Sequence, residues 1–318
     1  MKCSLLNSLV GDIVKKRIIT TYHDCCAHHT KLMCKLLRLD QQIYKNWLDF
    51  FVNEYTDFSL HNQDMEKIEN PIIMSFIVDS VECFDGIGIL HQQGSVTTAY
   101  PILRKLMELY FQIKFILQDD TENRALAFEA YYVSRKTRGK DDDRNVYLKY
   151  DKYRAYKKEA DRIYNEENYH YYPEWYEIYD TVEKQPCSKS QRKKLITSLK
   201  KLCEANGDAE IYDTLYNLLS KITHGFYARD NVKLIVSARK NYLREYRDPT
   251  GISYQTSCSN LLLSDIYRVF CKHYGIQADY DFLKKHSDLV KSVRSAENNY
   301  VESLQKQDES FCSAKEML

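Results

Sequence analysis

The feature that most constrains the fold of this chain is long helical periodicity with few residues to interrupt it. Apolar residues recur three and four positions apart over most of the 318 residues, which is the spacing that lines one face of an α-helix. Only 9 Gly and 5 Pro punctuate the chain, too few for the many short turns of a sandwich or barrel. The sequence therefore predicts an all-α fold, a multi-helix bundle.

The individual helices follow from the breaks in this pattern. Asn70-Pro71 is a favourable helix opening, and Gly94-Ser95 ends the helix that it starts. We expect helices near residues 71–92, 96–118 and 208–225 packed together, with others over 4–58, 122–135, 174–184, 257–273 and 279–305. Alternating apolar residues from Val232, followed by the turn Asp248–Gly251, predict a short β-hairpin within residues 231–257.

The length of the chain exceeds that of most single cores, so it forms either two packed helical subdomains or one elongated domain. A polar segment over residues 59–70 separates the first helices from the rest. We predict an N-terminal helical subdomain over 1–69, a helical core domain over 70–275, and a C-terminal helix and tail over 276–318.

Charge and composition limit the class of partner. The formal net charge of +1 excludes a globally basic nucleic-acid binder but permits a local basic surface. Such a surface is predicted between residues 184 and 201, which include Lys193 and Lys194. The chain also has 27 tyrosines, whose large rings and polar tips suit interfaces and stacking platforms as well as cores.

The ten cysteines are scattered without paired spacing, as expected of reduced thiols in a cytoplasmic protein. The N-terminus lacks a signal-peptide core, and the apolar run over residues 72–78 is too short to cross a bilayer. Cys25 and His29 lie four residues apart, but no second cluster completes a four-ligand site. No phosphate-binding loop or nucleophile elbow is present. We expect no metal, no cofactor and no membrane segment.

A stripe of polar and aromatic residues follows the helix predicted over 208–225. Tyr212, Tyr216, Ser220 and His224 recur at four-residue intervals and so share one helix face. Asp208 is a favourable N-cap for this helix. The stripe has two interpretations: a functional surface that ends in an imidazole, or half-buried packing in which His224 caps free carbonyl groups.

A second polar pair interrupts the apolar helix predicted over 96–118. Arg104 and Glu108 lie four residues apart, so they form either an ordinary ion pair on the helix surface or a half-buried arginine with its required partner. A third segment, over residues 135–162, mixes charges of both signs with tyrosines. It predicts either a solvated helix or a stacking surface for single-stranded nucleic acid.

Two motifs together carry a resemblance to a known family. Leu103-Arg104-x-x-x-Glu108, followed by Tyr216-x-x-Leu219-Ser220-x-x-x-His224-Gly225, resembles an uncharacterised family of bacterial helical domains over roughly residues 70–270. That family is similar in outline to HEPN domains, many of which are ribonucleases of phage-defence and toxin systems. The HEPN motif has an arginine four to six residues before its histidine, where this chain has none.

The resemblance implies a metal-independent endoribonuclease with a HEPN-like core, acting in phage defence or as a toxin, and commonly a homodimer. It implies His224 as acid or base, Arg104 as the cation that stabilises phosphorane charge, Glu108 as its orienting partner, and Ser220 with Tyr216 as phosphate-positioning groups. We also predict that Tyr212, Arg229, Lys193 and Lys194 bind RNA. Arg229 is an alternative source of the catalytic arginine.

A second hypothesis belongs to a different class. In it the chain is a non-catalytic helical sensor or partner-binding protein of a defence system, and the Arg104–Glu108 and Ser220–His224 pairs lock two helices together. An exposed, positive site favours the enzyme, whereas complete burial and hydrogen bonding favour the lock.

Overall fold

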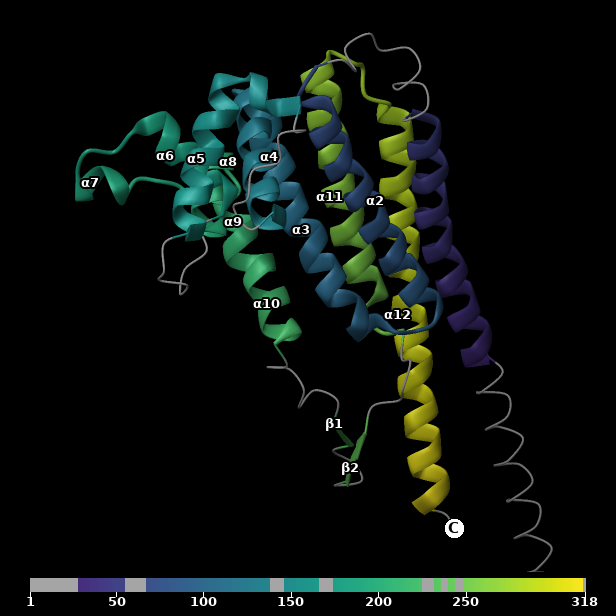
Figure 1. The fold of residues 1–318 in the computed structure, drawn as a ribbon. Helices are drawn as coiled ribbons and strands as arrows, with labels where there is room; N and C mark the ends of the chain where they lie inside the picture. Colours follow the sequence, from purple (N-terminus) through teal and green to yellow (C-terminus); the bar gives the residue numbers. More distant parts are fainter. Residues whose placement is uncertain are drawn as a thin grey trace, which may run out of the picture.

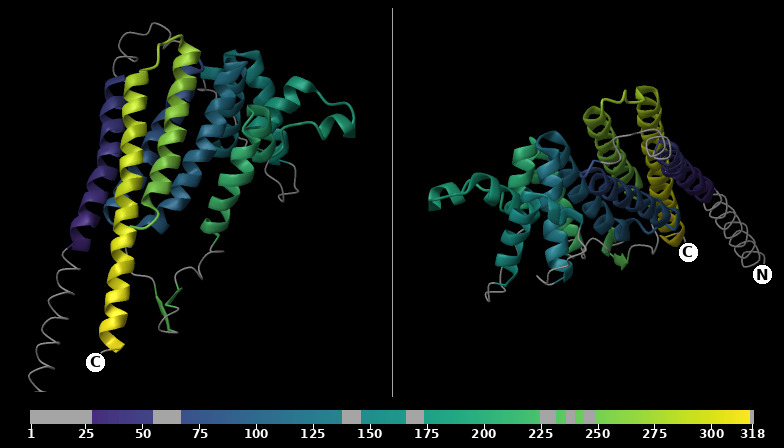
Figure 2. Two further views of the ribbon diagram at one scale, coloured as in Figure 1. Left: turned by 180° about the vertical axis from the view of Figure 1, so that it is seen from behind. Right: turned by 45° about the horizontal axis from the view of Figure 1, so that its top comes forward.

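A computed structural model describes residues 28–54, 67–137, 146–165, 174–224, 232–235, 240–243 and 249–316. The described chain is an all-α bundle (Figure 1), which confirms the predicted fold class. Its long helices lie side by side, and a group of shorter helices covers one flank (Figure 2).

The long helices are the segment over residues 28–54, α2 (Asn70–Gln92), α3 (Val96–Gln118), α11 (Ile252–Tyr274) and α12 (Tyr280–Glu316). The helices α2 and α3 follow the predicted limits because Pro71 lies in the first turn of α2 and Gly94, at φ 68°, separates the two. The predicted helix over 257–273 begins earlier, at Ile252, and α12 extends past the rest of the bundle (Figures 1 and 2).

The shorter helices follow α3 in the chain. They are α4 (Thr121–Thr137), the 3-10 turn η2 (Val146–Lys149), α5 (Asp151–Asn165), α6 (Trp175–Lys184), α7 (Lys189–Arg192) and α8 (Leu199–Asn206). The helix α5 exposes Asp151, Lys152 and Arg154 but buries Lys157, and it turns Tyr153 and Tyr156 inward, where both are fully buried. These two tyrosines therefore belong to the core and offer no stacking surface.

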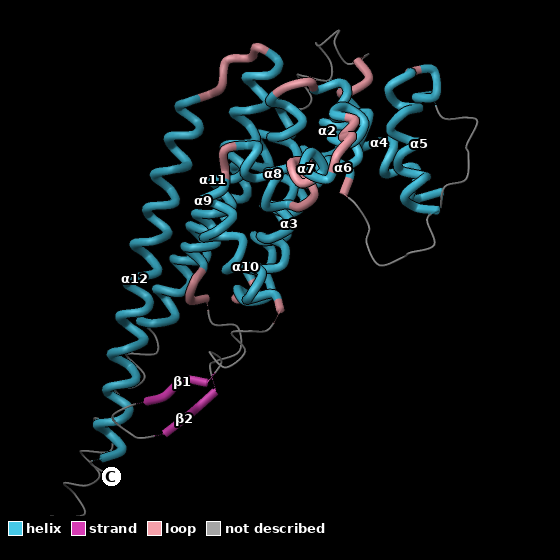
Figure 3. Tube along the Cα trace, turned by 90° about the vertical axis from the view of Figure 1, so that its left-hand side faces the viewer, coloured by secondary structure: helices cyan, strands magenta, loops and turns pink. Residues whose placement is uncertain are grey.

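The helix predicted over 208–225 forms from three consecutive pieces: α9 (Ala209–Ile211), a π-helical turn η3 (Tyr212–Tyr216) and α10 (Asn217–Thr223). It packs against α3. Beyond α10, strands β1 (Val232–Ile235) and β2 (Lys240–Leu243) pair antiparallel, with Val232 opposite Leu243 (Figure 3). Both lie within the range in which a hairpin was expected, 231–257, although residues 252–257 belong to α11 instead.

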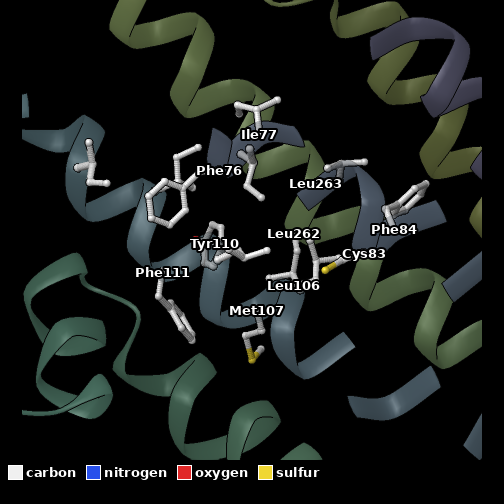
Figure 4. Close-up of a cluster of buried hydrophobic side chains, with 14 of the residues drawn as sticks. Phe76, Ile77, Cys83, Phe84, Leu106, Met107, Tyr110, Phe111, Leu262 and Leu263 are labelled. Carbon is white, nitrogen blue, oxygen red and sulfur yellow. The ribbon is translucent and has the colours of Figure 1, made fainter. Parts of the chain in front are cut away.

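The hydrophobic core lies where α2, α3 and α11 meet, as Figure 4 shows for Phe84, Leu106 and Leu263. Side chains from residues 28–54 and from α12 join the same cluster through Trp47, which packs edge-on against Phe282. The predicted domain limits at 69–70 and 275–276 stay predictions. Across both limits, buried side chains belong to one cluster.

A buried polar network ties three of the long helices together. His91 on α2 places Nδ1 2.9 Å from Asp40 Oδ2 and Nε2 2.8 Å from Gln255 Oε1. Gln255 donates through its own nitrogen to the Val96 carbonyl, so its oxygen is the acceptor. Both nitrogens of the imidazole therefore have a hydrogen-bond partner, and His91 and Asp40 form a pair that is buried on both sides.

Among the described residues, the cysteines at 34, 83, 187, 203, 258 and 271 are free thiols. No helix in the described ranges is both long and apolar enough to cross a bilayer.

Candidate functional site

The candidate site lies between α3 and the helix formed by η3 and α10, which pack side by side (Figure 1). Arg104 and Glu108 come from successive turns of α3, whereas Tyr216 ends the π-helical turn and His224 follows the last residue of α10. Side chains from the two predicted motifs are thus brought together, although more than a hundred residues separate them.

Three of these side chains form a closed ring of hydrogen bonds. Arg104 donates from Nη2 to the Tyr216 hydroxyl at 2.8 Å and from Nε to Glu108 Oε1 at 3.1 Å. The Tyr216 hydroxyl in turn donates to Glu108 Oε1 at 2.8 Å. Because Arg104 has only donors and Glu108 only acceptors, the direction of each hydrogen bond in the ring is determined. The ring fixes the plane of the guanidinium group.

The ionisation of the ring follows from its surroundings. Burial, together with the hydrogen bond to Glu108, raises the pKa of Tyr216 to about 12, so the phenol keeps its proton at neutral pH. Partial burial acts to lower the pKa of Arg104, but interactions with Tyr216 and Glu108 outweigh it and the pKa lies above its usual value. Arg104 is a permanent cation held by a neutral phenol and a carboxylate.

His224 completes the cluster from the solvent side. Its Nε2 lies 3.3 Å from Arg104 Nη1, and the side chain is exposed. A guanidinium group cannot accept a hydrogen bond, so Arg104 is the donor in this contact and Nε2 is the acceptor. The arrangement holds a basic nitrogen directly beside a fixed cation, and both reach solvent.

The π-helical turn places the aromatic residues of the stripe. One extra residue in a turn of helix rotates the side chains that follow it, and such turns are frequent at functional sites. The rings of Tyr212 and Tyr216 stack with centroids 4.9 Å apart and planes 19° apart. Tyr216 is 8% exposed, whereas Tyr212 is half-buried at the surface.

Not all predicted site residues lie in the cluster. The half-buried Ser220 contributes a carbonyl that accepts the His224 N–H at 3.0 Å, and its hydroxyl has no hydrogen bond within the described ranges. Lys193 and Lys194 follow the last residue of α7, which projects outward from the group of shorter helices, away from the cluster (Figures 1 and 2). Arg229 lies outside the described residues.

Two predicted residues make contacts that the sequence did not indicate. The Tyr216 hydroxyl donates its one proton to Glu108, and its role at a phosphate stays a prediction. Asp208 makes no N-cap hydrogen bond. Its nearly buried carboxylate instead accepts two hydrogen bonds from Lys114 Nζ, at 2.7 and 2.8 Å. The charge-assisted contact with Lys114 on α3 thus takes the place of the predicted N-cap hydrogen bond.

Sequence reasoning missed a supporting pair behind Glu108. Gln112 donates to the Glu108 carbonyl at 3.3 Å and accepts the indole N–H of Trp175 at 2.7 Å. The signal was present, because Gln112 continues the four-residue spacing of Arg104 and Glu108 along α3. It also missed the buried His91–Asp40 pair, although Asp40 lies between Leu36 and Ile43 on one apolar face.

The described residues do not form a metal-binding cluster at this site. Across the ranges that the structure describes, no group of three or more His, Cys, Asp or Glu side chains is arranged to hold a metal ion. Cys25, half of the spacing noted in the sequence, lies outside them. The cluster offers a base, a cation and a carboxylate, a set suited to acid–base chemistry at a phosphate.

The bundle and its paired motifs place this chain in an uncharacterised helical family. It belongs to the Family of unknown function (DUF5677), which matches residues 69–233. The match contains all four residues of the cluster, begins where the resemblance predicts and ends before the predicted limit near 270. No curated protein and no solved structure gave a match.

Proposed function

We propose that the cluster of Arg104, Glu108, Tyr216 and His224 is the active centre of a HEPN-like, metal-independent endoribonuclease. The observation that carries the proposal is the 3.3 Å contact between Arg104 Nη1 and His224 Nε2. It supplies from two helices the arginine and histidine that HEPN domains carry on one. The arginine that is absent before His224 in the sequence comes from α3.

The reaction follows from the two groups. His224 Nε2 takes the proton of a ribose 2′-hydroxyl, whose oxygen attacks the adjacent phosphorus. The new O2′–P bond forms as the P–O5′ bond breaks, and the phosphorane charge that develops is stabilised by Arg104. The 5′-oxygen leaves with a proton returned by an imidazolium or by water. The products are a 2′,3′-cyclic phosphate and a 5′-hydroxyl.

Tyr216 and Glu108 act through Arg104. Their hydrogen bonds hold the guanidinium group before substrate arrives, so that no reorganisation is needed as charge develops. When a phosphate enters, it accepts from Arg104 Nη1 in place of the exposed His224, which frees the lone pair of the base. Ser220, one turn before His224 on the same helix, is the group that we propose contacts the same phosphate.

The cellular role rests on the HEPN resemblance and on composition. We place the protein in the cytoplasm as an effector of phage defence or a toxin system, acting as a C2 homodimer with a defence-system partner. A dimer that brings two clusters into one cleft would supply both the base and the acid. Among the described tyrosines, Tyr132, Tyr254 and Tyr280 are exposed and are candidate interface residues.

The test is cleavage of single-stranded RNA by the purified full chain in excess chelator. We expect cyclic-phosphate products from the native protein and none from His224→Ala. The matched controls are Lys221→Ala, an exposed position in the last turn of α10, and Lys105→Ala, an exposed neighbour of Arg104. Both controls should cleave as the native protein does. Activity retained by His224→Ala would reject the proposal.

A second candidate function is favoured by a specific observation. Tyr216 is nearly buried and every proton in the ring has a partner, as in a structural lock between α3 and the η3–α10 helix. The protein would then be a non-catalytic sensor or partner-binding protein. The exposure of His224 distinguishes the two, because a lock does not require a histidine at its solvent edge.

A further inference from the structure

A positively charged arm projects from the flank of the molecule. It comprises residues 185–197 around the short helix α7 and leaves the body between α6 and α8 (Figures 1 and 2). Residues 187–194 are all exposed. The arm carries Lys189, Arg192, Lys193 and Lys194, and none of these side chains makes an ion pair or hydrogen bond with any residue that the structure describes.

The charge on the arm is one-sided. No Asp or Glu occurs between residues 184 and 203. Lys189, Arg192 and Lys193 are spaced to share one face of the turn, where like charges repel by roughly 0.2–0.5 kcal/mol per pair. Elsewhere in the described chain, exposed cations such as Lys200 and Lys291 have acidic partners. The arm therefore lacks the counter-charge that the rest of the surface has.

The base of the arm is braced. Asp180, 2% exposed, accepts from Lys184 Nζ at 2.7 Å where the arm leaves α6 and from the Ile196 N–H at 2.9 Å where it returns. Lys201 Nζ donates to the carbonyls of Lys193 and Leu195, both at 2.8 Å. A Ser188–Gln191 capping box closes the start of α7. The free cations are thus presented from a fixed backbone.

We propose that this basic arm binds the sugar–phosphate backbone of a nucleic acid, at a surface separate from Arg104 and His224. Its apolar residues, Leu195 and Ile196, are buried, so it offers nothing to insert among lipid tails. It has no exposed aromatic or aliphatic anchor of the kind that centres a protein interface. Closely spaced cations with exposed serine hydroxyls match a repeating phosphate chain.

The connection from the arm to the candidate site adds a path for a single strand. The arm continues into α8, where Lys200 lies with Nζ 5.9 Å from the ring centre of Tyr212. Tyr212 in turn stacks on Tyr216, the ring that holds Arg104. Binding of the sugar–phosphate backbone at the arm requires no cleavage of the strand, so the proposal does not depend on nuclease activity.

The test measures binding of the full chain in a His224→Ala background, which leaves RNA uncut. The probes are a fluorescent single-stranded RNA and a DNA of the same length, titrated across salt concentrations. Changing Lys189, Arg192, Lys193 and Lys194 together to Gln should weaken binding at least about tenfold at low salt. It should also reduce the slope of log K against log salt by about 2 to 3, at roughly 0.7 per phosphate contact. The more tightly bound probe identifies the nucleic acid.

The matched control removes the same number of exposed cations from α12, at Lys284, Lys285, Lys291 and Arg294. Circular dichroism checks that both variants fold. An unchanged salt slope in the arm variant, an equal loss in both variants, or no binding by the native sequence would overturn the proposal. The proposal would also be overturned if the arm variant lost binding to phosphatidylserine vesicles but bound RNA as tightly as the protein with the native arm. Arm-dependent binding without cleavage by the native chain would reject only the nuclease proposal.

Discussion

Arg104 and His224 lie 120 residues apart in the chain, yet their side chains meet at 3.3 Å between Nη1 and Nε2. The contact depends on the packing of α3 against α10, because neither helix carries both groups. Tyr216 and Glu108 fix the arginine from behind, and solvent reaches the histidine from the front. This asymmetry, rigid on one side and open on the other, is what a preorganised site needs.

Removal of the Tyr216 hydroxyl tests the positioning role. Tyr216→Phe keeps the ring and its stack on Tyr212 but leaves Arg104 oriented by Glu108 alone. We expect cleavage to fall about 10- to 100-fold, while the free energy of unfolding changes by about 1 kcal/mol, the net value of a typical hydrogen bond. Cleavage rates and urea denaturation measure the two. If Tyr216→Phe cleaved RNA at the native rate but was much less stable, the hydrogen-bonded ring would instead be a structural lock between the two helices.

The pH dependence of stability provides a second test of the same residue. The pKa of Tyr216 is raised in the folded state to about 12, so the fold favours the protonated phenol. Its contribution is complete below the unfolded pKa of about 10 and is lost as pH rises from there toward 12. The stability difference between the native protein and Tyr216→Phe should be constant from about pH 7 to 9 and shrink above pH 10. A difference that grows above pH 10 would contradict this.

The positions of the long helices could be predicted because local signals and tertiary packing agree. Val96–Gln118 matches its predicted limits, since Gly94-Ser95 and the apolar stripe at Leu106, Leu109 and Ile113 require the same helix. The prediction that Arg104 and His224 belong together came from two pairs with the same four-residue spacing, Arg104–Glu108 and Ser220–His224.

Other parts of the site could not be predicted, because they depend on long-range contacts. The Asp208 side chain would cap its helix in isolation, but Lys114 from α3 binds it instead. The hydrogen bond from Tyr216 to Glu108 joins two helices and could not be read from local spacing. The π-helical turn leaves no mark on the spacing of the stripe, and Lys193 and Lys194 project away because α7 leaves the body.

The two glycines of α2 give a matched pair for testing helix packing. A Cβ at Gly88 would lie 2.5 Å from Tyr44 Cγ, whereas one at Gly86 would lie 3.7 Å from Ile102 Cδ1. Gly88→Ala should therefore push residues 28–54 away from α2 and cost about 1–3 kcal/mol. Gly86→Ala should stabilise by about 0.5–1 kcal/mol through helix propensity. Thermal denaturation measures both, and equal melting temperatures would contradict the close packing of Tyr44.

The buried pair of His91 and Asp40 predicts a strongly non-additive cycle. His91→Leu alone leaves the buried Asp40 carboxyl group without this hydrogen-bond partner and should cost about 1–3 kcal/mol, and Asp40→Leu should cost a similar amount. The double variant should be far less destabilised than the sum, because neither residue then leaves the other without its partner. Urea denaturation of the four proteins measures the coupling. Additive losses would show that the two residues act independently.

The most direct measurement of the central claim is a double-variant comparison at Arg104 and His224, with cleavage and melting recorded on the same samples. If the two form one active centre, each change to Ala should reduce cleavage by about 100-fold or more with little effect on the melting temperature. The double variant should lose little beyond either single one. Full cleavage by either single variant would contradict the account. So would a native protein that does not cleave RNA, together with single variants that both melt at a lower temperature.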